Sequence, residues 1–132
     1  MHSRILYLTN IARQQRGIAT VQHDPILQQV AQAHAEAMAS GGYFDHVDRQ
    51  LRGVGERLLD AGYNYRWAGE NISAGKDNVD AVFEWWLTSA AHRANILKPE
   101  FTGAGFGYAF IADDRLSFHH YWVHVFAAPL PD

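Results

Sequence analysis

The last third of the chain alternates large side chains with small ones, and this pattern limits the possible folds more than any other feature. From residue 104 to 110 aromatic side chains alternate with glycine or alanine, and a second alternating run covers 118 to 126 after the polar pair Asp113-Asp114. A period of two is that of a β-strand, so the sequence predicts an antiparallel hairpin. We interpret the glycines of the first run as sites of close backbone packing, because no helix follows them as in a phosphate-binding loop.

Upstream of this hairpin, apolar residues recur at helical spacing between residues that start and stop helices. The predicted helices, each named by its marker residues, are Ile5 to Gly17, Asp24 to Gly41, Gly53 to Ala61, Asp77 to Ala90 and a short turn from Ser89 to Leu97. Asp77 or Asn78 is the expected cap of the fourth helix, and the Ser89 side chain that of the last turn. A short strand is predicted from Trp67 to Ala74, within which we interpret the formal glycosylation sequon at 71–73 as a structural turn. Helices first and paired strands last predict an α/β layered domain.

Size and composition predict one ordered domain spanning residues 1–132. Of the 132 residues 48% are hydrophobic, and no repeat or linker-like segment interrupts them. The net charge of −3 and the lack of Lys/Arg runs exclude nucleic acid as an expected partner. The absence of cysteine excludes a disulfide framework and a thiolate zinc site. No apolar run approaches the ~20 residues of a membrane helix, and the N-terminal residues do not form a signal peptide.

Histidines and carboxylates supply the candidate chemistry. His46 follows the second predicted helix, Glu70 lies in the predicted strand, and Glu84 and His92 are about two helical turns apart. Brought together, these four side chains could hold a divalent metal or transfer protons. Spacing alone leaves open the alternative that they are separate surface residues.

The other histidines are weaker candidates. His34 interrupts the apolar face of a predicted helix, so we interpret it as a hydrogen-bonded core or boundary residue. His119 and His120 are expected on opposite faces of the sheet. His124 shares a face with His120 and Trp122 and is a further candidate for a ligand cleft.

Four segments in register resemble a known family. They are residues 44–46 (FDH), 62–75 (GYNYRWAGENISAG), 82–108 (VFEWWLTSAAHRANILKPEFTGAGFGY) and 121–127 (YWVHVFA). Their order and spacing resemble the signature segments of the CAP superfamily, which includes cysteine-rich secretory proteins, antigen-five proteins and plant pathogenesis-related proteins. Without cysteines, the chain is similar to the short bacterial members. The resemblance implies a three-layer α-β-α sandwich with a small, largely antiparallel sheet.

The resemblance also implies a site. It maps a cleft tetrad onto His46, Glu70, Glu84 and His92, in which the two histidines can hold a divalent metal, often zinc, while the glutamates orient them or bind through water. The chemistry is consistent, because neutral imidazoles ligate Zn²⁺ and a carboxylate on the other ring nitrogen fixes the tautomer. His124 replaces the family's usual glutamine and adds a titratable group to the expected cleft. A secreted or cell-envelope location is implied in the same way.

These observations leave three functions open. The favoured one is a non-enzymatic extracellular module whose cleft binds a peptide, glycan or lipid, with an optional metal. The second is a metal-dependent or Ser-His-Glu hydrolase, in which a bound water, Ser73 or Ser89 attacks and Glu70 or Glu84 acts as the base. The third is a structural scaffold in which the His/Glu cluster only organises the core.

Overall fold

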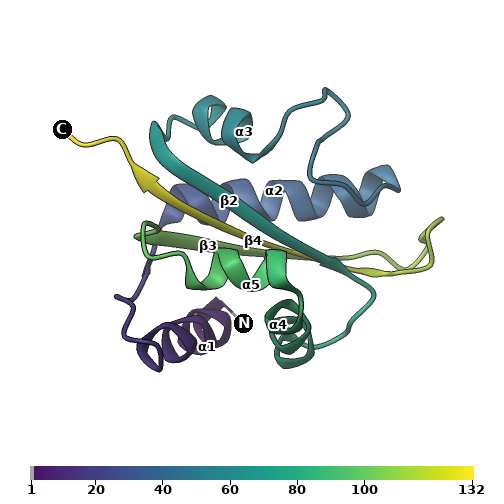
Figure 1. Cartoon of the computed structure of the whole chain (residues 1–132). Coiled ribbons are helices and arrows are strands. Elements are labelled where there is room, and N and C mark those ends of the chain that lie inside the picture. Colours follow the sequence, from purple (N-terminus) through teal and green to yellow (C-terminus); the bar gives the residue numbers. More distant parts are fainter. Residues whose placement is uncertain (1) are drawn as a thin grey trace.

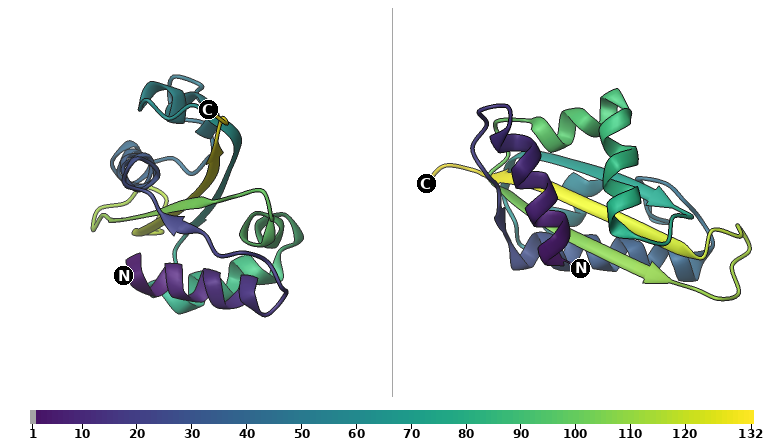
Figure 2. Two further views of the ribbon diagram at one scale, coloured as in Figure 1. Left: turned by 90° about the vertical axis from the view of Figure 1, so that its left-hand side faces the viewer. Right: turned by 90° about the horizontal axis from the view of Figure 1, so that it is seen from below.

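The computed structural model describes residues 2–132 and arranges them as a sheet between two layers of helices (Figure 1). The helices are α1 (His2–Gln14), α2 (Pro25–Gly41), α3 (Val54–Asp60), α4 (Val79–Thr88) and α5 (Ala90–Leu97). The strands are β1 (Gln22–His23), β2 (Tyr65–Ala74), β3 (Gly103–Phe110) and β4 (His120–Pro129). Helices α2 and α3 cover one face of the sheet, and α1, α4 and α5 cover the other, as both views in Figure 2 show. The expected three-layer α-β-α sandwich is confirmed.

The sheet has the strand order β1-β3-β4-β2. β3 and β4 form the predicted antiparallel hairpin, in which Phe106 is opposite His124. β4 also pairs antiparallel with β2, where Glu70 is opposite Val125. The two-residue β1 adds a parallel pairing with β3, so the sheet is mixed but largely antiparallel.

Helix α2 begins and ends at the residues that the sequence marks. The Asp24 side chain accepts hydrogen bonds from the backbone N–H groups of Ile26 and Leu27, and Pro25 is the first helical residue. Gly42 ends the helix in the left-handed region at φ 68°, a conformation that glycine adopts without a steric penalty. The long helix is therefore well defined along the sheet.

The glycines of β3 allow α2 to lie directly on the sheet. A Cβ atom added to Gly105 would be 2.1 Å from the nearest backbone atom of α2, and one added to Gly107 would be 2.5 Å away. Real Cβ contacts are never this short, so these two positions exclude any side chain. The interpretation of the glycines as sites of close backbone packing is confirmed.

The opposite face carries an aromatic core beneath α1, α4 and α5. Trp86, Phe106, Trp122 and Phe126 are all buried there. Arg13 of α1 is also buried, and its guanidinium donates hydrogen bonds to backbone carbonyls at positions 19, 96, 98 and 101. These bonds attach α1 to the segment that joins α5 to β3.

The junction between α4 and α5 differs in detail from the sequence prediction. Ser89 separates the helices with an extended backbone (φ −94°, ψ 126°), as expected, but its side chain makes no capping hydrogen bond, so that expectation is wrong. The guanidinium of Arg93 instead donates to the carbonyl oxygen of Leu87 at 3.1 Å, near the end of α4. At the start of α4 the predicted cap is confirmed, because Asn78 Oδ1 accepts from the N–H of Ala81 at 2.8 Å.

Within residues 2–132, no helix combines the length and the apolar character needed to cross a membrane.

Candidate functional site

The centre of the candidate site is the pair formed by His46 and Glu70. Glu70 in β2 is opposite Val125, which belongs to the core beneath α2, so the Glu70 carboxylate lies on the face of the sheet that α2 and α3 cover. His46 lies in the loop between α2 and α3, and its Nδ1 is 3.0 Å from Glu70 Oε1. The Glu70 side chain is 2% exposed and the His46 side chain 54% exposed. The pair therefore joins a buried carboxylate to an accessible imidazole.

This contact sets the protonation of the His46 ring. The hydrogen bond to Glu70 raises the pKa of His46 above its ordinary value, against the opposing effect of partial burial. Because a carboxylate accepts hydrogen bonds, Nδ1 carries the proton that it shares with Glu70. In the neutral ring Nε2 then holds the free lone pair, which is the arrangement of a metal-ligating histidine oriented by a carboxylate.

Arg57 of α3 is the second partner of the buried Glu70 carboxylate. Its Nη2 donates to Glu70 Oε2 and to the backbone oxygen of His46, each at 2.8 Å, and its side chain is 9% exposed. A buried carboxylate needs such a partner, because an uncompensated charge in the interior is strongly destabilising. This role of Arg57 was not predicted from the sequence. The available signal was a charged residue at a buried position of the predicted third helix.

The structure confirms that His34 is a hydrogen-bonded core histidine. It is 2% exposed, and its Nε2 is 2.8 Å from the backbone oxygen of Asp45. Burial lowers the pKa of His34, so the ring is neutral. The carbonyl of Asp45 is thus held by α2, and that of His46 by Arg57 of α3. These two contacts fix the loop that presents the His46 side chain.

His92 approaches the same region from α5. Burial lowers the pKa of His92, and the charge of the nearby His46 lowers it further. Its Nδ1 is buried and has no hydrogen-bond partner. Its ring packs against Trp85 with a centroid distance of 4.9 Å. His92 therefore lies near enough to His46 for the charge of that ring to act on its pKa, and its Nδ1 is used by no protein group.

Two asparagines that sequence reasoning missed hold α5 against β2. Asn71 is fully buried and donates to the backbone oxygen of His92 at 2.9 Å. Asn95 donates to Asn71 Oδ1 at 2.9 Å and to the backbone oxygen of Glu70 at 3.2 Å. The interpretation of residues 71–73 as a turn is wrong, since they lie within β2. Asn71 instead fixes the position of His92 relative to Glu70.

Glu84 is located apart from His46, Glu70 and His92. It is exposed on α4 and lines a groove of about 310 Å³ together with Leu8 and Ile11 of α1 and with Gln15, the residue after that helix. Trp85 contacts the His92 ring, and successive helical residues point about 100° apart, so Glu84 faces α1 instead.

His124 is also located apart from His46, Glu70 and His92. Its ring packs among Trp86, Phe106 and Phe126 at centroid distances of 5.8, 5.7 and 4.1 Å, on the face of the sheet opposite the Glu70 carboxylate. Complete burial lowers the pKa of His124 to about 3, so the ring is neutral. His124 is a core residue in this structure.

The serines considered as nucleophiles do not form a catalytic pair. Ser73 is 2% exposed and is opposite Trp122 in the sheet, on the face away from the Glu70 carboxylate. In the part of the chain that the structure describes, no hydrogen bond joins a serine hydroxyl to His46, Glu70 or His92.

The donor set determines which metal site could form here. The free donors are Nε2 of His46 and the imidazole of His92, whose buried Nδ1 is unpartnered. The described residues contain no group of three or more His, Cys, Asp or Glu side chains that could hold a metal ion. The described side chains therefore do not form a closed structural cage, and a metal held by the two imidazoles alone would need water or a ligand in its remaining positions.

The sandwich and its sequence together define the family. The sequence profile of the Cysteine-rich secretory protein family (CAP) matches residues 6–126, nearly the whole chain. The chain belongs to this family.

Two proteins of Bacillus subtilis (strain 168) are similar in sequence. One is the uncharacterized protein YkwD, 36% identical over 105 residues, which are 80% of this chain and 41% of YkwD. The other is the uncharacterized membrane protein YlbC, 35% identical over 104 residues, which are 79% of this chain and 30% of YlbC. The chain thus spans less than half the length of either relative.

Solved structures show the same fold. An extracellular protein containing an SCP domain from Bacillus anthracis aligns with a TM-score of 0.83 at 31% identity, over 96% of this chain and 40% of that one. An outer surface protein from Borrelia burgdorferi aligns with a TM-score of 0.82 over 97% of this chain and 89% of that one, at 17% identity, a likeness of fold alone.

Proposed function

We propose that this chain is a ligand-binding domain that acts outside the cell or in its envelope, and that His46 and His92 hold a divalent metal, with zinc the expected ion. One observation carries the proposal. The buried Glu70 carboxylate lies 3.0 Å from Nδ1 of the half-exposed His46 and leaves the other ring nitrogen free. A carboxylate that orients an imidazole in this way is the usual support of a metal-ligating histidine.

The surroundings of the pair support a site that is open to a second molecule. A metal held by two imidazoles would supply a Lewis acid with positions left for water or a ligand atom. Arg57 and Glu70 keep the His46 ring oriented, and Asn71 holds the His92 backbone. These residues are in place before any ligand binds, so little ordering is required on binding.

Exposed aromatic side chains near the cluster suggest the class of ligand. Trp85 is 40% exposed beside His92, and Phe44, two residues before His46, is 39% exposed. Such surfaces stack on sugar rings, peptide side chains or lipid tails, so the proposed ligand is a peptide, glycan or lipid. Trp122 is buried in the core and does not contribute to such a surface.

The proposed location rests on similarity to other proteins. The Bacillus anthracis protein is described as extracellular and the Borrelia protein as an outer surface protein. A binding function without a reaction agrees with the finding that, among the described residues, no serine hydroxyl is hydrogen-bonded to His46, Glu70 or His92. Turnover of a peptide or ester substrate panel by the wild type, lost on Glu70→Gln in a folded variant, would contradict this part of the proposal.

The experiment that tests the metal is thermal unfolding with and without Zn²⁺. A ligand that binds the native state raises the melting temperature, so zinc is expected to stabilise the wild type at neutral pH. The matched control is His23→Ala. His23 is exposed and lies in β1, at the edge of the sheet opposite β2. Zinc stabilisation should persist in that variant and vanish in His46→Ala/His92→Ala. An equal zinc shift in the double variant would overturn the proposal.

A further inference from the structure

The groove of about 310 Å³ between α1 and α4 lies on the face of the sheet opposite the Glu70 carboxylate, where both helices are seen in Figure 2. Its walls are the facing sides of the two helices, and the lining residues of each recur one helical turn apart. They are Leu8, Ile11, Ala12 and Gln15 on the α1 side and Asp80, Phe83, Glu84 and Leu87 on α4. Leu8, Ile11 and Leu87 are only partly buried, so the groove offers apolar surface to solvent.

The two carboxylates of this groove differ in their partners. Asp80 is paired with Arg4 of α1, whose Nη2 is 2.8 Å from Asp80 Oδ2. Glu84 follows Asp80 by one turn of α4, but the residue one turn after Arg4 on α1 is Leu8. Among the described residues, no Lys, Arg or His side chain forms an ion pair with Glu84. The exposed Glu84 carboxylate is therefore next to apolar side chains and has no cation beside it.

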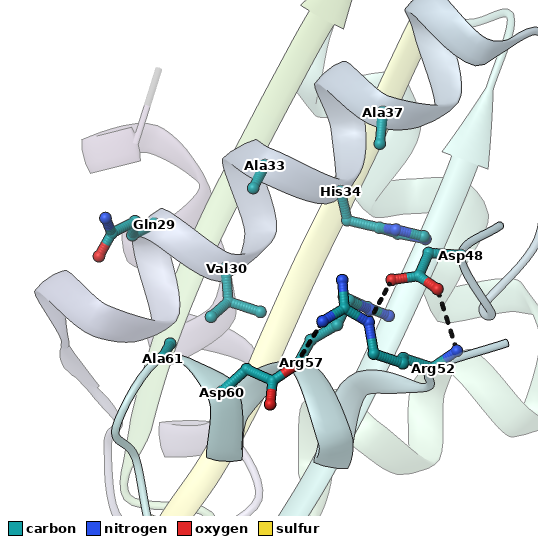
Figure 3. A pocket seen from close by; sticks show the side chains of 10 residues that line it. All are labelled: Gln29, Val30, Ala33, His34, Ala37, Asp48, Arg52, Arg57, Asp60 and Ala61. Atoms are coloured by element: carbon teal, nitrogen blue, oxygen red, sulfur yellow. Dashed lines mark hydrogen bonds and ion pairs between the residues drawn. The ribbon is translucent and has the colours of Figure 1, made fainter. Parts of the chain in front are cut away.

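The pocket of about 330 Å³ between α2 and α3 shows the opposite situation. There Arg52 is paired with both Asp48 and Asp60 (Figure 3), so the carboxylates of that pocket already have a cation. Of the eight residues that line the groove between α1 and α4, none is basic and two are acidic. A negative charge beside an apolar wall is complementary to a cation that carries an apolar chain.

We propose that the groove between α1 and α4 binds an amphiphilic amine, with its ammonium group at Glu84 and its aliphatic chain between Leu8 and Leu87. The chain removes apolar surface of the groove from water. The ammonium group has three donors, so it can bond to the exposed carboxylate and remain hydrated on its solvent side. Exposed ion pairs are weak, so the chain supplies most of the affinity and the charge supplies the selectivity.

The test is an NMR titration of the ¹⁵N-labelled chain at neutral pH, without metal, with three probes of the same chain length. Hexylammonium carries the proposed cation, hexan-1-ol has a neutral head and hexanoate has a negative one. Hexylammonium is expected to shift the amide signals of Leu8, Ile11 and Leu87 saturably. Hexan-1-ol should bind about threefold to fivefold more weakly, since it lacks the ion pair. Hexanoate should bind about tenfold more weakly or not at all, because both carboxylates repel it. Unchanged spectra with hexylammonium, or equal affinity for the three probes, would overturn the proposal.

Glu84→Gln isolates the contribution of the carboxylate. In this variant hexylammonium is expected to bind no more tightly than hexan-1-ol, whose own affinity should stay as in the wild type. Glu56→Gln is the matched control, since Glu56 is exposed on α3 in the other helical layer, and the preference for hexylammonium should persist there. A preference that survives in Glu84→Gln would overturn the proposal.

Gln15→Lys supplies a cation to the groove from the chain itself. Gln15 is exposed and lines the groove, so the new side chain should compete with hexylammonium and weaken its binding. Gln14→Lys changes the net charge equally at a position that points about 100° away, and hexylammonium should bind there as in the wild type. Equal weakening in the two variants would overturn the proposal. Groove signals that shift with protein concentration in the absence of any probe would indicate a second copy of the chain in the groove and would overturn it as well.

This site is separate from the metal proposed at His46 and His92 and does not depend on it. The titrations contain no metal, and zinc stabilisation is measured without any of the three probes. Failure of one proposal is therefore distinguishable from failure of the other.

Discussion

Glu70 Oε1 lies 3.0 Å from His46 Nδ1, so a carboxylate that is almost completely buried controls a histidine that reaches the surface. The second oxygen of the same carboxylate accepts from Arg57 at 2.8 Å. Each carboxylate oxygen therefore has its own partner. This arrangement links the interior of the α2/α3 layer to the proposed metal ligand.

The Arg57–Glu70 pair is expected to be essential for stability. Arg57→Met leaves a buried carboxylate without its cationic partner, so the free energy of unfolding should fall by about 3–5 kcal/mol, measured by urea denaturation at neutral pH. Arg66→Met is the control, because Arg66 is exposed on β2, and it should change little. Adding Glu70→Gln to Arg57→Met should cost less than the sum of the two single changes, since the uncompensated charge is then absent. Strict additivity would contradict this account of the pair.

The His46–Glu70 contact predicts a pH dependence of definite sign. The pKa of His46 is raised in the folded state by its hydrogen bond to Glu70. Its contribution is therefore fully present below the ordinary value of 6.5 and is lost as the pH rises through the higher folded value. Without metal, the stability difference between wild type and His46→Ala should shrink as the pH is raised from about 6 to about 8. A difference that grows over this range would contradict the contact.

Gly105 tests the close approach of α2 to the sheet. In Gly105→Ala the new Cβ would meet backbone atoms at 2.1 Å, and the helix must move. The expected loss of stability is about 3 kcal/mol or more, at the upper end of overpacking effects. In the control, Gly103→Ala, the nearest contact is the flexible end of the Leu27 side chain at 3.2 Å, so the loss should be much smaller. Similar melting temperatures for the two variants would argue against the observed packing.

His124 is expected to make the domain sensitive to acid. Burial lowers the pKa of His124 from 6.5 to about 3, so the unfolded chain binds a proton that the folded chain does not. Stability is therefore lost as the pH falls from 6.5 toward 3. His124→Leu removes this term, and acid titration followed by circular dichroism should place its unfolding midpoint at lower pH than that of the wild type. A midpoint at higher pH would exclude this role for His124.

The sequence predicted the elements of the fold well because their signals are local. The period of two in β3 and β4, the Asp24-Pro25 start of α2 and the capping by Asn78 each depend on neighbouring residues only. The site was predicted less completely because its geometry depends on which face each element presents. Glu84 differs from Trp85 by one helical position, yet it faces α1 and not His92. Arg57 was missed as a partner of Glu70 because the two come from different layers.

Anomalous X-ray scattering from crystals soaked in Zn²⁺ would show directly whether His46 and His92 together hold a metal. We expect an anomalous peak at the zinc edge about 2.0–2.1 Å from a ring nitrogen of His46 and at the same distance from a ring nitrogen of His92. Crystals of the His46→Ala variant should lack that peak. A peak confined to exposed histidines such as His23, with no signal between His46 and His92, would contradict the account.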